Sequence, residues 1–238
     1  MKTFIANAFG VLTLLALTFG VGGAPGTSPP APPAIPSLWD TAWILPLADQ
    51  ETIDSYLTAR SAQGFEVVLV GVTNWGMRNV PLGNGQKLFL GDRHCDSRGC
   101  FADLTKANNT AFDYLDALIT KAGTLGLIIG LLPMSNGGSS DYVRVLEDAT
   151  SNEHRAYGYG RYLGQRYKGY ANLIWVLGGD VCPDPGDAVS YPTIVPLTRF
   201  LAHGILHGGA RQPMTFHAGA IVSRRMSASS DSTRQMGP

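Results

Sequence analysis

Short apolar runs alternate with amphipathic stretches through most of the chain. Phe65–Val72, Leu125–Pro133 and Leu173–Leu177 are almost continuously apolar, which is typical of strands covered on both faces. Shorter strands are predicted at Trp43–Leu45 and Pro213–His217. The pattern therefore predicts five strands.

Helices are predicted between these strands because apolar residues recur there at helical spacing. Their expected bounds are about Asp49–Gln63, Asn109–Ala122, Asn152–Tyr167 and Thr193–His207, and a long loop is expected over 73–107. Strands that alternate with helices form a parallel sheet with helical crossovers. An open doubly wound sheet and a (β/α)₈ barrel both fit this order.

The residues that follow the strands favour the barrel. No G-x-G-x-x-G follows any strand, so the sequence predicts no dinucleotide and no other cofactor. Instead, Trp75, Asp180 and His217 come after strand ends, which form the active face of a barrel. We therefore predict an α/β fold, an incomplete (β/α)₈ barrel of about five parallel strands over residues 37–217.

The chain begins with a segment that is typical of secretion. Residues 1–24 have a positive start, an apolar stretch too short to span a bilayer comfortably, and small residues before a cleavage point. A proline-rich linker follows over residues 25–36. We expect a secreted, extracellular protein with no membrane attachment after cleavage of the signal peptide.

The charges are balanced, with 18 basic and 18 acidic residues among 238. Nucleic acids and anionic membranes select basic patches, so neither is expected as a partner. The sequence does not indicate an oligomeric state.

Three cysteines fit an oxidising compartment. Cys95 and Cys100 are expected to form a disulfide across a glycine-containing loop, which leaves Cys182 unassigned. A zinc site of His94 with these two cysteines lacks a second ligand pair at a usual spacing. Asn108 begins an N-glycosylation sequon.

A further pair of histidines has metal-binding spacing. His203 and His207 lie four residues apart on a predicted helix. Because no third ligand lies nearby in the sequence, an exposed helical face is the preferred interpretation and no metal site is predicted.

Asp180 ends the most distinctive stretch of the chain, "NLIWVLGGD". Two glycines before it allow a tight exit from the strand and a close approach of substrate to the backbone. An acid at this place stands at the mouth of a barrel and can be catalytic. An aspartate that caps a helix or binds loop amides is an equally good interpretation of the spacing.

Several segments resemble one known family, the apiosidase-like glycoside hydrolases. In order along the chain they are "DTAW" (40–43), "YLTARSAQGFEVV" (56–68), "GLIIGLLP" (126–133), "AYGYGRYLGQRYKGYANLIWVLGGD" (156–180) and "PMTFH" (213–217). The resemblance implies a (β/α)₈ barrel that acts on plant cell-wall polysaccharides, including removal of apiose-bearing side chains from pectin.

The resemblance also implies a mechanism with two carboxylates. Retaining glycosidases use an acid/base and a nucleophile about 5 Å apart. Asp180 matches the family's acid after the fourth strand, so it is the predicted acid/base. Trp43 and Trp75 are candidates for stacking on a sugar, with filling of the barrel top as the alternative. Asp40 and His217 are candidates for binding substrate hydroxyls, with structural roles as the alternatives.

The sequence departs from the family near its end. Residues 218–238 hold five serines and three arginines, without aromatic residues or a helical or strand period. We expect this tail to be disordered and the barrel, which usually takes about 250 residues, to be incomplete. A truncated or frameshifted chain would lack the nucleophile, so catalysis is uncertain. The alternative is an inactive remnant or a carbohydrate-binding protein without turnover.

Overall fold

The computed structural model describes residues 38–73, 78–97, 99–134, 152–181 and 190–218. The predicted signal peptide, the proline-rich linker, Trp75, Cys182 and the tail beyond residue 218 lie outside the described residues. In the described part of the chain, no helix is both long and apolar enough to cross a membrane.

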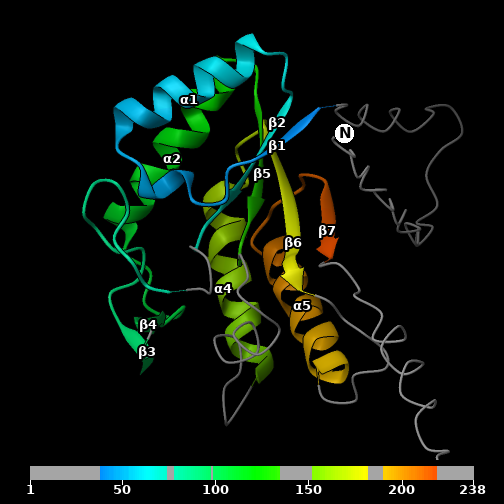
Figure 1. Cartoon of the computed structure of the whole chain (residues 1–238). Helices are drawn as coiled ribbons and strands as arrows, with labels where there is room; N and C mark the ends of the chain where they lie inside the picture. The colour runs from blue at the N-terminus through cyan, green and yellow to red at the C-terminus, as the bar shows by residue number, and fades with distance from the viewer. Residues whose placement is uncertain (1–37, 74–77, 98, 135–151, 182–189, 219–238) are drawn as a thin grey trace, which may run out of the picture. The chain divides into compact units, whose positions relative to one another are not determined.

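Five parallel strands form one sheet, and their order in space follows their order in the chain. From edge to edge they are β1 (Trp39–Thr41), β2 (Val67–Gly71), β5 (Ile128–Leu132), β6 (Leu173–Val181) and β7 (Met214–Ala218). Every neighbouring pair is parallel, and the arrowheads of β5, β6 and β7 point the same way in Figure 1. The predicted parallel α/β fold is confirmed.

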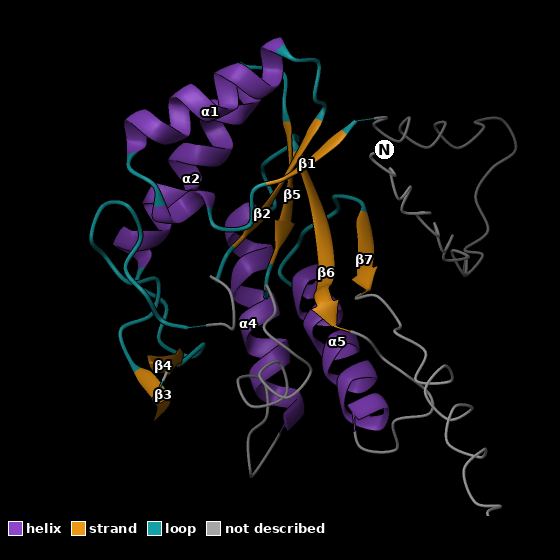
Figure 2. Cartoon of the chain, in the orientation of Figure 1, coloured by secondary structure: helices purple, strands orange, loops and turns teal. Residues whose placement is uncertain are grey.

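A helix lies in the chain between each pair of consecutive sheet strands (Figure 2). The helices are α1 (Gln50–Ala62), α2 (Asn109–Thr124), α4 (Asn152–Tyr167) and α5 (Ser190–His207). Asp49 caps α1 as predicted, because its carboxylate accepts a hydrogen bond from the Thr52 amide at 2.8 Å. Gly64 follows with a φ of 81°, a conformation that suits glycine after a helix.

The two faces of the sheet pack differently. On one face, alternate strand residues such as Val68, Ile129 and Trp175 join the main core with residues of the helices. The residues between them, including Leu69 and Val176, form a separate cluster on the other face. This second face corresponds to the interior of a barrel, which side chains from alternate strand positions fill. We call it the inner face.

The first strand lies earlier in the chain than predicted. We expected Trp43–Leu45, but the strand is β1, and Leu45–Leu47 forms the 3₁₀ turn η1. Pro46 explains the difference, because it stands at the start of this turn with a fixed φ and no amide hydrogen. The sheet still reaches Trp43, whose carbonyl accepts a hydrogen bond from the Gly71 amide at 3.1 Å.

The loop between β2 and α2 contains a hairpin that the sequence did not predict. Its strands, β3 (Asp92–Asp96) and β4 (Gly99–Ala102), pair antiparallel in a small separate sheet. The segment is rich in charged residues and lacks the apolar alternation by which a half-buried strand is recognised. Phe101 is the clear exception, being almost fully buried.

Helices α4 and α5 approach each other backbone to backbone. Four glycines at this contact leave no room for a side chain: Gly160, Gly164, Gly204 and Gly208. A Cβ atom on Gly204, for example, would lie 2.2 Å from the carbonyl oxygen of Tyr157. Interiors pack so densely that such an overlap forces the backbones apart. The helices therefore depend on glycine for their spacing.

Candidate functional site

Trp43 and His217 meet although they come from opposite edges of the sheet. Their ring centroids lie 5.2 Å apart in an edge-to-face arrangement. Trp43 follows β1, and His217 belongs to β7, the fifth strand of the sheet. In an eight-stranded barrel the first and fifth strands face each other across the interior. The contact therefore shows that the sheet curves as part of a barrel does. Trp43 and His217, both predicted site residues, lie at the carboxyl ends of their strands.

Asp180 lies in a bulge of β6, in the segment that runs alongside the part of β7 that contains His217. The pairing of β6 with β7 runs from Leu177 opposite Phe216 to Val181 opposite Ala218, with an irregularity between them. Between these two pairs, β6 advances by four residues while β7 advances by only two, so β6 contains extra residues that bulge out of the pairing. The strand does not stop at Leu177, as we predicted, but continues through this bulge to Val181.

The two glycines of the motif make the bulge possible. Gly178 and Gly179 have φ angles of 94° and 60°, which residues with side chains rarely adopt. A Cβ atom on Gly178 would also lie 2.5 Å from the carbonyl oxygen of His217. Bulges of this kind are common beside active sites, where they redirect a side chain. The backbone of Asp180 thus stands at the carboxyl end of the fourth strand.

Asp40 binds residues of α1 and is not part of the contact between Trp43 and His217. One carboxylate oxygen accepts hydrogen bonds from the Tyr56 hydroxyl and from the guanidinium of Arg60, both on α1. The other oxygen accepts a hydrogen bond from the Thr41 amide at 2.9 Å. Trp43 packs with the inner-face cluster, whereas Asp40 joins β1 to α1 on the helix side. Of its two interpretations, the structural one fits, and Asp40 is not brought to Trp43 and His217.

These contacts also set the charge of Asp40. Burial raises its pKa, but the hydrogen bonds from Tyr56 and Arg60 outweigh burial, so the pKa lies below the usual value. The carboxylate is ionised at neutral pH and paired. An acid that must carry a proton to a leaving group needs the opposite shift.

Cys95 and Cys100 are joined by a disulfide across the β3–β4 hairpin. The two sulfurs and the Asp92 carboxylate form the only group of three potential metal-ligating residues within the described ranges. Disulfide sulfurs are not thiolates, so this group does not provide the charged ligands that zinc requires.

Asn108 stands at the N-cap position of α2. Its side-chain amide donates a hydrogen bond to the Lys87 carbonyl at 3.0 Å. That nitrogen is the atom to which an N-linked glycan attaches, so glycosylation and this contact involve the same atom. Glycosylation at Asn108 stays a prediction.

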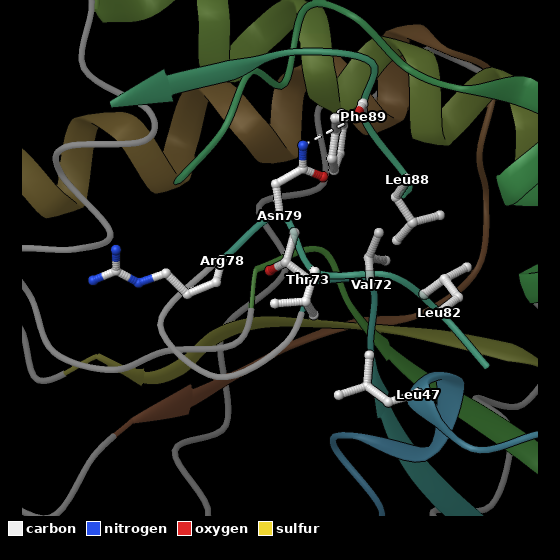
Figure 3. A pocket seen from close by; sticks show the side chains of 9 residues that line it. Leu47, Val72, Thr73, Arg78, Asn79, Leu82, Leu88 and Phe89 are labelled. Carbon is white, nitrogen blue, oxygen red and sulfur yellow. Dashed lines mark hydrogen bonds between the residues drawn. The ribbon is translucent and has the colours of Figure 1, made fainter. Parts of the chain in front are cut away.

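The loop after β2 has a buried polar centre that the sequence analysis missed. Asn79 donates to the carbonyls of Phe89 and Gly91, and Arg78 stacks on the Phe101 ring with its guanidinium carbon 3.8 Å from the centroid. Figure 3 shows the Asn79 side chain turned toward Phe89, with Arg78 pointing away from it. The burial of Arg78 and Asn79 is visible only in the structure, so the sequence held no signal that distinguished them from other polar loop residues.

Two hollows lie near these elements, and neither lies at the meeting point of Trp43 and His217. A cavity of about 10 Å³ beneath the loop has room for about one water molecule, not a sugar. An open hollow of about 410 Å³ lies beside β1 and η1. Its lining is mainly apolar: Thr41, Ala42, Ile44, Leu45, Leu47, Ala48 and Tyr56.

The comparison with known families agrees with this arrangement. Residues 36–235 match the family described as "Apiosidase-like, catalytic domain". The chain belongs to the apiosidase-like family. The match extends beyond His217, where we had placed the end of the resemblance. No curated protein is similar enough to count as a match.

Solved glycoside hydrolase structures share the fold of this apiosidase-like chain. One described as "Glycoside hydrolase" is 25% identical with a TM-score of 0.56, over 78% of this chain and 37% of its own. A family 5 glycoside hydrolase from Bacteroides vulgatus is 23% identical with a TM-score of 0.56, over 78% and 35%. GH5_18 from Streptomyces cattleya, in complex with GlcNAc, is 14% identical with a TM-score of 0.52, over 77% and 45%. The chain spans about a third of the length of the first two.

Proposed function

We propose that this apiosidase-like protein is a secreted glycoside hydrolase that acts on pectic polysaccharide of the plant cell wall. The observation that carries the proposal is the place of Asp180 within a chain of this family. Its backbone stands at the carboxyl end of the fourth strand, in the bulge that passes His217 of β7, and the His217 ring contacts Trp43. In barrel enzymes this end of the strands holds the catalytic residues.

The proposed chemistry is acid/base catalysis with retention. Asp180 protonates the oxygen of the leaving group, and a second carboxylate about 5 Å away attacks the anomeric carbon. Water then hydrolyses the glycosyl-enzyme while Asp180 acts as the base. Trp43 offers an aromatic face to the sugar, and His217 a hydrogen-bonding group.

Two features support secretion. Residues 1–24 have the pattern of a signal peptide. The disulfide between Cys95 and Cys100 is of a kind that persists in oxidising compartments and is rare in the cytosol.

Replacement of Asp180 tests the acid/base role. Asp180→Asn keeps the shape of the side chain but removes proton donation, so hydrolysis of apiose-containing pectin should fall by about 10²- to 10⁴-fold. The loss should be smaller for an aryl glycoside whose phenol leaves without protonation. Reducing-sugar release and phenol release measure the two rates. Equal losses on both substrates would contradict an acid/base role.

One observation favours a second candidate, carbohydrate binding without turnover. Asp40 and Asp180 are the only carboxylic acids in the five described strands of the sheet, and Asp40 bonds to α1. Binding of pectic oligosaccharides without release of reducing ends, weakened by Trp43→Ala, would support this candidate. Hydrolysis that Asp180→Asn removes would exclude it.

A further inference from the structure

Two histidines and a tyrosine are joined at the contact between α4 and α5. His203 and His207 lie one turn apart on α5, with ring centroids 6.3 Å apart and ring planes inclined by only 24°. The hydroxyl of Tyr157, on α4, lies 3.0 Å from Nδ1 of His207. Both histidines are exposed, so solvent and ions reach them.

We propose that His203 and His207 form a binding site for a divalent transition metal ion, oriented by Tyr157. The sequence alone favoured an ordinary exposed helical face, because two histidines without a third residue are a weak signal. The structure supplies the third residue, which acts on His207 and not on the metal. This site is separate from the carboxyl ends of the strands and goes beyond the proposed glycosidase function.

The hydrogen bond with Tyr157 occupies Nδ1 of His207 and leaves Nε2 as the nitrogen that can bind a metal ion. A neutral imidazole carries one hydrogen, and its other nitrogen has the lone pair that binds metal. When Nδ1 donates its hydrogen to the Tyr157 oxygen, the lone pair is on Nε2, which does not take part in that bond. Metal-ligating histidines usually have such an oxygen partner on the second ring nitrogen. Binding of metal at Nε2 would select this tautomer.

The base of the site is held firmly by the helix contact. Gly204, between the two histidines, lies against the Tyr157 backbone, where a Cβ atom would be 2.2 Å from the carbonyl oxygen. The same close approach that requires glycine therefore brings Tyr157 beside His207. The exposed ring of His203 is the one that would turn to bring a nitrogen of each histidine to a metal ion at bond lengths of about 2.0–2.1 Å.

The ligands determine which metals bind. Imidazole nitrogen suits Cu²⁺, Ni²⁺ and Zn²⁺, and Cu²⁺ should bind most tightly of the three. Mg²⁺ and Ca²⁺ prefer oxygen ligands and should not bind. Water completes the coordination. Imidazoles must be neutral to bind, so acidification should release the metal.

Titration of the protein, purified without a histidine tag, tests the proposal. Isothermal titration with CuCl₂ should show one specific site per chain, and electron paramagnetic resonance of the bound Cu²⁺ should show two imidazole nitrogens. His203→Gln and His207→Gln should each lower the Cu²⁺ affinity at least about tenfold, and the double variant, which keeps neither imidazole, should bind Cu²⁺ at least as weakly as either single variant. Tyr157→Phe should lower affinity up to about tenfold, with both nitrogens retained.

A matched control tests whether the two histidines bind one ion together or whether any two histidines on α5 would give the same affinity. Combining His203→Gln with Arg199→His restores a second exposed histidine on α5 but places it two turns from His207, too far for one ion. This variant should bind Cu²⁺ as weakly as His203→Gln, while thermal midpoints without metal stay unchanged for all the exposed replacements. Full affinity in the control, or a signal from one imidazole in the unmodified protein, would overturn the proposal.

Discussion

Replacement of Gly204 by alanine should destabilise the protein, although alanine is the better residue for a helix. A Cβ atom at this position would lie 2.2 Å from the carbonyl oxygen of Tyr157 and 2.8 Å from the backbone nitrogen of Arg161. Both atoms belong to the backbone of α4, so no side-chain rotation relieves the overlap. The helices must move apart by about 1 Å, the shortfall from ordinary packing contact.

The net effect follows from two opposing contributions. Overpacking of a core contact costs about 1–3 kcal/mol, and rigid backbone neighbours place Gly204→Ala near the upper end. Alanine in place of glycine contributes up to about 1 kcal/mol of helix propensity in the other direction. The free energy of unfolding should therefore fall by about 2 kcal/mol, which lowers the thermal midpoint by about 4–8 °C for a chain of this size.

Gly158 provides a control on the neighbouring helix. It is exposed on α4, and a Cβ atom there would meet nothing within 4 Å. Gly158→Ala should therefore raise the free energy of unfolding by about 0.5–1 kcal/mol. Urea denaturation followed by circular dichroism measures both variants. If Gly204→Ala were as stable as Gly158→Ala, the backbone contact between α4 and α5 would not exist as described.

Two further predictions concern contacts away from the candidate site. Asp40 has a lowered pKa, so its contribution to stability is present above its unfolded value of 3.8 and is lost as the pH falls through the folded value. Asp40→Asn should thus destabilise the protein at pH 7, and this loss of stability should disappear as the pH falls through the folded pKa of Asp40. Thermal melts across an acidic pH series would show this, and an equal loss at every pH would contradict the ionised contact. Replacing both Cys95 and Cys100 by serine should weaken the β3–β4 hairpin by up to about 2 kcal/mol, because the disulfide closes a short loop. Hydrogen exchange should accelerate in the hairpin and remain unchanged in β5.

The sequence was most informative where one periodicity extended over many residues. The predicted helix Asn152–Tyr167 has the bounds of α4, because its apolar stripe is long and faces a buried sheet. Strands β2 and β5 were recognised from continuous apolar runs for the same reason. A strand that is buried on both faces is apolar along its whole length, so it can be recognised from the sequence without knowing which distant segments it contacts.

Contacts between distant segments were not predictable in this way. Gly160 and Gly204 contribute nothing to an apolar stripe, yet they set the distance between α4 and α5. Asp40 and Trp43 lie three residues apart in one motif, and the sequence assigned both to the same site. Their separation onto different faces depends on where β1 ends, which Pro46 shifts relative to the predicted strand.

The bulge of β6 was only partly predictable from the sequence. Its glycines were visible in the sequence, but only the pairing with β7 shows why they are required. Gly178 must pass the His217 carbonyl without a side chain, and the ladder resumes at Val181 opposite Ala218. The segment ending in Asp180 is therefore held at both ends while standing out from the ladder. This arrangement gives the carboxyl end of the fourth strand a fixed backbone next to His217, the residue of β7 whose ring contacts Trp43.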